Sequence, residues 1–166
     1  GRITPAMRDY VVTQLKDVII PALERTSGRA YDEEKLREHL RLSAQAEDDL
    51  VWVLQSAKHK PSPIDAYFGA VYYVGPIFSA FRGTEGAVAY YKALRSEIEE
   101  RIREGKGPVT PDGDIEKERF RVVVEGPPNW TSFRQFWKMF ADEGAVAVAS
   151  TYTKVGGVFD TGFRHD

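Results

Sequence analysis

The chain of 166 residues contains no cysteine. It therefore forms no disulfide, offers no thiolate nucleophile, and cannot hold an iron–sulfur cluster through thiolates of its own. No apolar run approaches the roughly 20 residues of a membrane-spanning helix, and no basic segment followed by an apolar one indicates a signal peptide. The net charge of −2 gives no electrostatic case for nucleic acid or an anionic membrane as a partner. We therefore expect a cytoplasmic protein that binds neither.

Local motifs with a strong chemical signature are also missing. There is no phosphate-binding loop of the G-x-x-x-x-G-K type, no dinucleotide fingerprint and no pair of histidines at metal-ligand spacing. The three histidines, His39, His59 and His165, are scattered and flanked by charged residues, so we interpret them as exposed. The carboxylates of residues 47–49 lie on the polar face of a predicted helix, and we interpret them as solvated.

What the sequence does contain is the composition of a globular protein, with 42% hydrophobic and 29% charged residues. A chain of this length can form one domain that buries roughly 70% of its unfolded surface. Start signals at Pro5, Asp32, Ser62-Pro63 and Thr84 predict four successive helices, because apolar residues recur at helical spacing after each of them. Pro21 should bend the first of these helices.

The apolar residues of the first helix make it amphipathic, and they are Tyr10, Leu15, Val18, Ile19, Ala22 and Leu23. The apolar residues of the second helix define a face that we expect to be buried, and they are Leu36, Leu40, Ala44, Leu50, Val51 and Leu54. The segment from Ile64 to Phe81 is apolar nearly all round and should lie near the centre of the fold. The stretch from Gly105 to Asp114, rich in Gly, Pro and Asp, is the best internal boundary.

The second part of the chain has a strand–helix–strand pattern. A β-branched strand at 119–125 is followed by a helix at 131–143, capped by a Thr or Ser, and by a second apolar strand at 145–151. A helical crossover makes such strands parallel, with a right-handed connection. We therefore predict an α/β fold, in which a helical region (1–115) leads into the start of a Rossmann-like α/β domain with a partial parallel sheet (116–166).

Two parallel strands are too few for a domain, because parallel sheets are covered on both faces and need more strands. The chain does not begin with Met, and only Tyr152 to Asp166 follow the second strand. We therefore expect a fragment of a larger subunit, whose sheet has an edge that is open or covered by another chain. The alternative is a complete small α+β protein.

The loop from Glu125 to Trp130 is the best candidate for a binding site. Ligands of open α/β sheets bind at the carboxyl ends of the strands, beside helix N-termini, and both this loop and the stretch from Ser150 to Lys154 lie there. Two consecutive prolines stiffen the loop, and Asn129 offers both donors and an acceptor. In the alternative interpretation, Trp130 packs in the core and Glu125 is an exposed residue at the strand edge.

A series of short motifs runs along nearly the whole chain. They are Arg8-x-Tyr10, Gln14-Leu15, Leu23-Glu24-x-Thr26-x-Gly28-Arg29, Asp32-Glu33-Glu34-x-Leu36, and Arg121 to Trp130 as a strand-E-G-x-P-x-W element. In this order they resemble the 2-hydroxyacyl-CoA dehydratase and benzoyl-CoA reductase family. The tail from Ser150 to Gly157 is more similar to the benzoyl-CoA reductase branch.

The resemblance implies an anaerobic radical acyl-CoA enzyme with two Rossmann-like domains, of which this chain would contain the start of the second. In such enzymes an ATP-hydrolysing activator injects an electron into a 4Fe–4S cluster, which passes it to the thioester or aromatic ring of an acyl-CoA. The family holds this cluster with cysteines. Because the chain has none, the ligands would lie outside it, and the isolated fragment should be inactive.

From the resemblance we expect part of a benzoyl-CoA reductase subunit that acts with other subunits of the same enzyme on an aromatic acyl-CoA. One alternative is a 2-hydroxyacyl-CoA dehydratase subunit. The other comes from a different class, a non-catalytic helical and α/β module that binds a partner or a small anion through the same loop.

The expected chemistry suggests roles for five residues. Reduction places negative charge on a carbonyl or ring, and aimed donors in a dry pocket stabilise it. Asn129, with the backbone N–H groups of the helix start, would be such a donor, and Trp130 would wall the acyl pocket. Glu125 or Tyr152 would protonate the reduced ring, with neither favoured by the sequence. Lys154 would meet a phosphate of coenzyme A.

Overall fold

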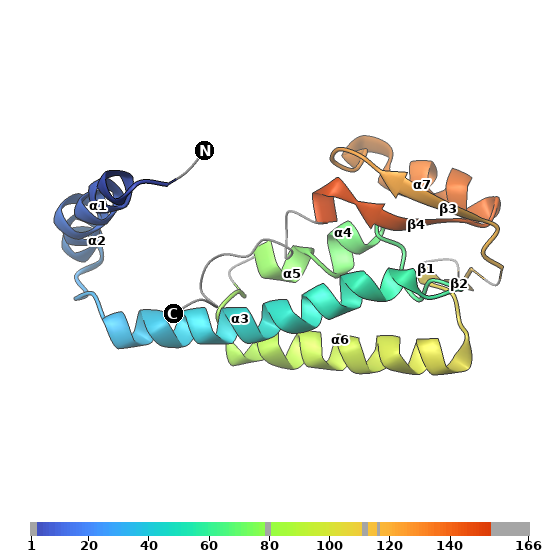
Figure 1. Ribbon diagram of the computed structural model, residues 1–166, viewed down its shortest axis with the longest axis horizontal. Coiled ribbons are helices and arrows are strands. Elements are labelled where there is room, and N and C mark those ends of the chain that lie inside the picture. The colour runs from blue at the N-terminus through green and yellow to red at the C-terminus, as the bar shows by residue number, and fades with distance from the viewer. Residues whose placement is uncertain (1–2, 79–80, 111–112, 116, 154–166) are drawn as a thin grey trace. The chain divides into compact units, whose positions relative to one another are not determined.

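The computed structural model describes residues 3–78, 81–110, 113–115 and 117–153 (Figure 1). The chain divides into two compact units, Gly1–Arg37 and Glu38–Asp166. None of the helices in the described part of the chain combines the length and the apolar content needed to cross a membrane.

The first unit contains one helical segment, made of α1 (Pro5–Thr13), the π-helical η1 (Gln14–Ile19) and α2 (Ile20–Ser27), and the first residues of the next helix. The wider π-helical turns stand directly before Pro21, whose ring and missing N–H disfavour a regular helix there. The predicted bend at Pro21 stays a prediction. None of the residues in these three elements is buried, so the apolar residues of the predicted amphipathic helix are not part of a core within this unit.

The long helix α3 (Glu33–Gln55) begins as predicted, since Asp32 Oδ1 accepts the N–H of Lys35 at 3.0 Å. Its buried face is rotated from the predicted one and consists of Leu42, Ser43, Ala46, Glu47, Leu50 and Val53. Only Leu50 belongs to both sets. The interpretation of Glu47 as solvated is therefore wrong, because its carboxylate is buried and forms an ion pair with Arg82.

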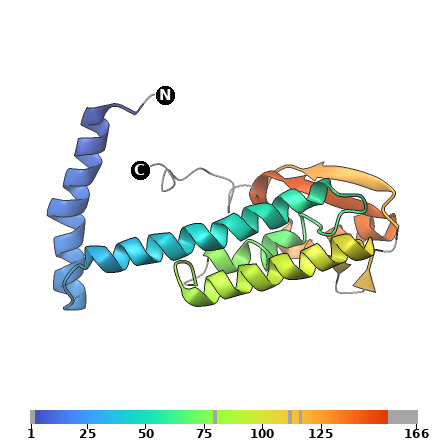
Figure 2. The same cartoon turned by 60° about the horizontal axis from the view of Figure 1, so that its bottom comes forward.

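Helix α6 (Glu85–Glu104) lies beside α3 in both views (Figures 1 and 2). It begins at the predicted residue, with Thr84 Oγ1 accepting the N–H of Ala87 at 3.1 Å. Between the two helices lies a core cluster in which the fully buried ring of Tyr91 packs with Ala46 and Leu50 of α3. The remaining short elements near these helices are η2 (Ser56–Lys58) and the antiparallel pair β1 (Val109–Thr110) and β2 (Gly113–Asp114).

The segment that the sequence places at the centre is buried only in part, since residues 62–69 and Val74 are buried but Tyr72 is 52% exposed, and it does not start as a helix. Residues 62–68 form a buried loop, and only the short helices α4 (Gly69–Tyr72) and α5 (Gly75–Phe78) follow. The predicted helix start at Ser62-Pro63 is thus wrong. The physical reason is a bond to a distant strand, because the N–H of Ala66 donates to the carbonyl of Ala147 at 2.6 Å.

The strand–helix–strand unit is confirmed. Strand β3 (Phe120–Val124) pairs in parallel with β4 (Ala145–Ser150), and they are joined by η3 (Trp130–Ser132) and α7 (Phe133–Asp142). The helix begins two residues later than predicted, because a 3₁₀ turn comes first and the side chain of Asn129 caps it. The observed two-stranded parallel sheet fits the predicted α/β fold.

The two strands differ in burial. Most of β4 is buried, whereas Val123 of β3 is 71% exposed. On its outer edge β3 pairs with no other strand among the described residues. The sheet therefore has the open edge that the sequence predicts for part of a larger subunit.

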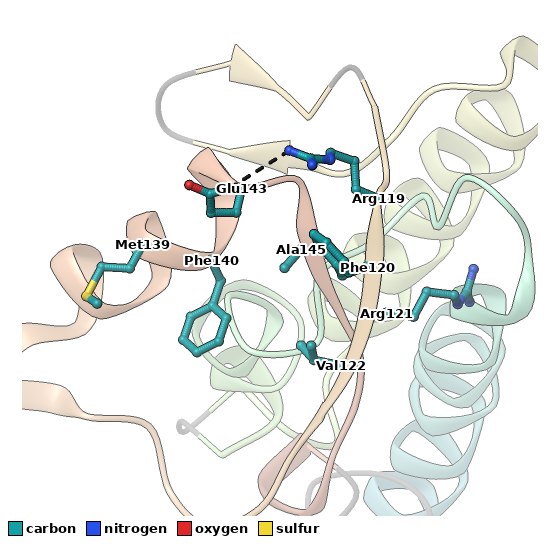
Figure 3. A pocket seen from close by; sticks show the side chains of 8 residues that line it. All are labelled: Arg119, Phe120, Arg121, Val122, Met139, Phe140, Glu143 and Ala145. Carbon is teal, nitrogen blue, oxygen red and sulfur yellow. Dashed lines mark ion pairs between the residues drawn. The ribbon is translucent and has the colours of Figure 1, made fainter.

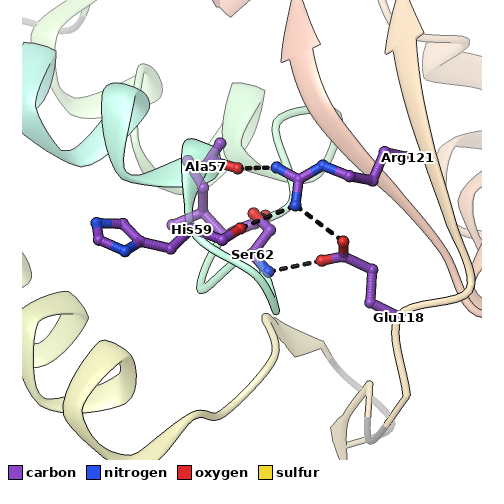
Figure 4. A network of polar contacts seen from close by, with 6 residues as sticks. Ala57, His59, Ser62, Glu118 and Arg121 are labelled. Carbon is purple, nitrogen blue, oxygen red and sulfur yellow. Dashed lines mark hydrogen bonds and ion pairs between the residues drawn. The ribbon is translucent and has the colours of Figure 1, made fainter.

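A polar network fixes the start of β3 to the loop that follows η2 (Figure 4). The guanidinium of Arg121 donates to the carbonyls of Ala57 and His59, the latter at 2.8 Å. It also pairs at 2.9 Å with Glu118, whose other carboxylate oxygen accepts the N–H of Ser62 at 2.6 Å. Because the Glu118 side chain is buried, these bonds replace its hydration and join the sheet to the helical part of the second unit.

Candidate functional site

The two stretches that the sequence places at the strand ends lie side by side. The N–H of Gly126, just after β3, donates to Thr151 Oγ1, just after β4, at 2.9 Å. Gly126 has a φ of 87°, which a residue with a side chain rarely adopts, so the chain can turn sharply there. The carboxyl ends of both strands thus meet in one small region, which we call the strand-end site: residues 125–133 and 150–153.

Asn129 is held at both its backbone and its side chain. Its N–H donates to the hydroxyl of Tyr67 at 3.0 Å, and its Oδ1 accepts the N–H of Ser132 at 3.4 Å. One of the helix-start amides predicted as ligand donors is therefore already engaged. The side-chain NH₂ of Asn129 makes no hydrogen bond with any residue that the structure describes, so it keeps both of its donors.

Trp130 is fixed on one side and open on the other. Its ring stacks on Phe133 with centroids 5.7 Å apart and meets the ring of Tyr152 edge-on at 5.8 Å. At 53% exposure it is not a core residue, so the alternative in which Trp130 packs in the core is wrong. The two predicted site residues Trp130 and Tyr152 are in contact, although 22 positions separate them in the sequence.

The remaining predicted residues are less constrained. Glu125 is exposed at the end of β3 and forms no ion pair within the described part of the chain, which fits either interpretation of this residue. Lys154 lies outside the described residues.

Tyr67 is the member of the site that sequence reasoning missed. It is only 5% exposed, and its ring stacks on Phe133 at 5.0 Å with an interplanar angle of 13°. Its hydroxyl accepts the N–H of Asn129. The only sequence signal was its place in the apolar segment predicted to be central, since a contact across 62 residues leaves no local pattern.

Asp65 fixes the backbone on which Tyr67 stands. This buried carboxylate accepts the N–H groups of Tyr67, Phe68 and Ala147 at 2.9–3.0 Å. Burial raises the pKa of Asp65, and the backbone hydrogen bonds oppose that shift by favouring the charged form. The Trp137 indole nitrogen makes no well-formed hydrogen bond with any described residue, yet it lies near enough to Asp65 to lower this pKa weakly.

The largest of three described hollows lies at the opposite end of the strands. It has a volume of about 640 Å³ and opens between the start of β3 and the end of α7, with Arg119 and Glu143 paired at 3.8 Å beside it (Figure 3). A second of about 350 Å³ lies between α4 and α6, and a third of about 20 Å³ lies under α7. None of these three is lined by residues 125–130, so the predicted cleft at that loop stays a prediction.

Metal ligation finds no support in the described residues, where no group of three or more His, Asp or Glu side chains could hold an ion. His59 is exposed, as predicted. His39 is also exposed, but its Nδ1 shares a hydrogen bond with the carbonyl of Gly83 at 2.7 Å. His165 lies outside the described residues.

Comparison with known proteins decides the family. The sequence model of the family described as 2-hydroxyglutaryl-CoA dehydratase, D-component, matches residues 2–161. The chain belongs to this family. The resemblance inferred from the short motifs is therefore confirmed.

Three curated relatives are longer proteins. The chain is 69% identical over all of its 166 residues to a subunit of the benzoyl-CoA reductase of Thauera aromatica, and covers 38% of that protein. It is 28% identical to the (R)-phenyllactyl-CoA dehydratase alpha subunit of Clostridium sporogenes and to the (R)-2-hydroxyisocaproyl-CoA dehydratase alpha subunit of Clostridioides difficile. Those matches cover 90% of the chain and 35% of each relative. The chain thus spans little more than a third of the relatives' length.

Proposed function

We propose that this chain is part of a benzoyl-CoA reductase subunit, which takes part in the ATP-dependent ring reduction of an aromatic acyl-CoA. The observation that carries this proposal is the 69% identity, along the whole chain, to a subunit of an enzyme of that name. Identity to the two dehydratase subunits is much lower, at 28%. A 2-hydroxyacyl-CoA dehydratase subunit is the second candidate, because the matching family model carries a dehydratase description.

The activity in this proposal belongs to the complete enzyme. The complete enzyme would contain further subunits, act on an acyl-CoA substrate and receive electrons from an ATP-hydrolysing activator. A 4Fe–4S cluster would supply the low-potential electron. The residues of this chain do not fit a thiolate-held cluster, because the sequence has no cysteine, so the proposal places the cluster ligands in other parts of the enzyme. Residues 1–115 would form a helical region and residues 116–166 the start of a Rossmann-like domain.

The strand-end site would contribute to the acyl-CoA pocket. Asn129 supports this, because its side-chain NH₂ donors remain available to an oxygen that gains negative charge. Trp130 would wall the acyl group, since one side of its ring is held by Phe133 and about half of the residue is exposed. Glu125 or Tyr152 would supply a proton to the reduced ring, and Lys154 would meet a phosphate of coenzyme A.

The test is the reaction of the intact enzyme. The complete complex is assayed anaerobically with its activator, ATP and a reductant, once with benzoyl-CoA and once with a 2-hydroxyacyl-CoA. The proposal predicts a cyclic diene product and ATP hydrolysis with benzoyl-CoA only. Dehydration of the hydroxyacyl-CoA without ring reduction would favour the second candidate. If neither substrate were turned over, the chain would be interpreted as a non-catalytic module.

A further inference from the structure

The hydroxyl hydrogen of Tyr67 makes no hydrogen bond to any residue that the structure describes. A phenolic hydroxyl can accept hydrogen bonds and donate one. Here it accepts the N–H of Asn129 at 3.0 Å, and no residue in the described part of the chain accepts its proton. Because the residue is only 5% exposed, this donor is withdrawn from bulk water but lies directly against the strand-end site.

The position of this hydroxyl is fixed before any ligand arrives. The ring is stacked on Phe133 and also contacts Phe136, with centroids 5.6 Å apart. The backbone N–H of Tyr67 is bound to Asp65, which also binds the N–H of Ala147 in β4. The side chain is thus attached to both the sheet and α7, so little conformational entropy is lost when its hydroxyl meets a ligand.

We propose that Tyr67 donates its phenolic hydrogen to a ligand oxygen that gains negative charge during the reaction. This inference rests on the proposed function, under which that oxygen is the thioester carbonyl of the acyl-CoA. The proton stays on the tyrosine, so the step is the strengthening of a hydrogen bond and no bond is made or broken. Donation by the Asn129 N–H to the same hydroxyl polarises it and makes it a better donor.

The direct test is Tyr67→Phe in the intact enzyme with its activator and benzoyl-CoA. Phenylalanine keeps the ring that stacks on Phe133 and removes only the hydroxyl. We expect kcat to fall on the order of a hundredfold with little change in KM, as for the loss of one donor aimed at developing charge.

Tyr91→Phe is the matched control. Tyr91 is also buried, and its hydroxyl donates to the carbonyl of Tyr73 at 2.7 Å, between helices of the second unit. This variant should lose stability but keep its kcat. If the role of Tyr67 were purely structural, Tyr67→Phe would likewise lose stability and keep its kcat.

A second variant separates donation from packing. Incorporation of 2,3-difluorotyrosine at position 67 keeps both the ring and a hydroxyl that can donate. We expect this variant to keep kcat within a few-fold of the unmodified enzyme, whereas Tyr67→Phe loses it. An unchanged kcat in Tyr67→Phe, or an equal loss of kcat in both variants, would overturn the inference. Failure of the unmodified enzyme to process any acyl-CoA would instead overturn the proposed function, and this inference with it.

Discussion

At the scale of single residues, the buried carboxylates Glu47 and Asp65 depend on long-range partners. Glu47 forms an ion pair with Arg82, 35 positions away, and Asp65 binds the N–H of Ala147, 82 positions away. A charged residue in a helical pattern usually faces water, so the sequence predicts a solvated Glu47. The error arises because the compensating partner cannot be read from neighbouring residues.

Asn129→Ala should affect turnover more than stability. Loss of the capping oxygen of η3 costs about 1 kcal/mol of folding free energy, whereas loss of an aimed donor costs about 3 kcal/mol of transition-state stabilisation. That second value is roughly a hundredfold in rate. Turnover of benzoyl-CoA by the intact variant enzyme, compared with its unfolding midpoint, gives both numbers. Unchanged turnover and affinity in a folded variant would make the loop from Glu125 to Trp130 a structural turn.

Asp65 should give the protein a distinct pH dependence. Because its pKa is raised on folding, the folded state binds more protons than the unfolded state between the ordinary and the raised pKa values. The contribution of Asp65 to stability is therefore present at low pH and falls as the pH rises through this window. The free energy of unfolding of the original protein, minus that of Asp65→Asn, should decrease over this range. A difference that is flat or rises with pH would contradict the assignment.

At the scale of elements, local sequence patterns predict those helices and strands whose conformation is set by neighbouring residues. The β-branched run of β3, the aromatic spacing of α7 and the apolar run of β4 specify their elements directly, and the crossover specifies their parallel pairing. Local patterns do not predict the loop at residues 62–68, because its backbone conformation is set by hydrogen bonds to β4. The contact between the two strand ends was predictable from topology, but the place of Tyr67 beneath it was not.

Arg121→Lys tests how β3 is attached to the helical part of the second unit. Lysine keeps the charge but lacks the planar fork that serves two carbonyls and Glu118 together. Buried acceptors without donors should cost about 1–3 kcal/mol of folding free energy, measured by chemical denaturation. The matched control is Arg119→Lys, because that exposed side chain pairs with Glu143 only at 3.8 Å and should change stability by less than about 0.5 kcal/mol. Equal losses in the two variants would show that the network does not hold β3.

At the scale of the whole molecule, exposed apolar side chains around β3 indicate a surface that other polypeptide covers. Val123 and Met139 are 71% and 70% exposed, and the outer edge of β3 is unpaired within the described part of the chain. The curated relatives are more than twice as long as this chain. We expect further polypeptide of the intact enzyme to cover both the edge and the neighbouring face of α7.

Hydrogen exchange of the intact enzyme checks this expectation. In an edge strand, alternate amides point away from the sheet and exchange quickly, whereas a covered strand protects all of them. We predict slow exchange along the whole of β3 (Phe120–Val124). Fast exchange of every second amide would show that the edge stays open in the assembled enzyme.

The most direct test of the proposed acyl-CoA site is a structure of the intact enzyme with benzoyl-CoA bound. We predict the acyl group at the carboxyl ends of β3 and β4, with Trp130 against the aromatic ring. The side-chain NH₂ of Asn129 and the hydroxyl of Tyr67 should lie within hydrogen-bond distance of the thioester carbonyl. An acyl group bound out of contact with all three residues would show that the strand-end site is not part of the acyl-CoA pocket.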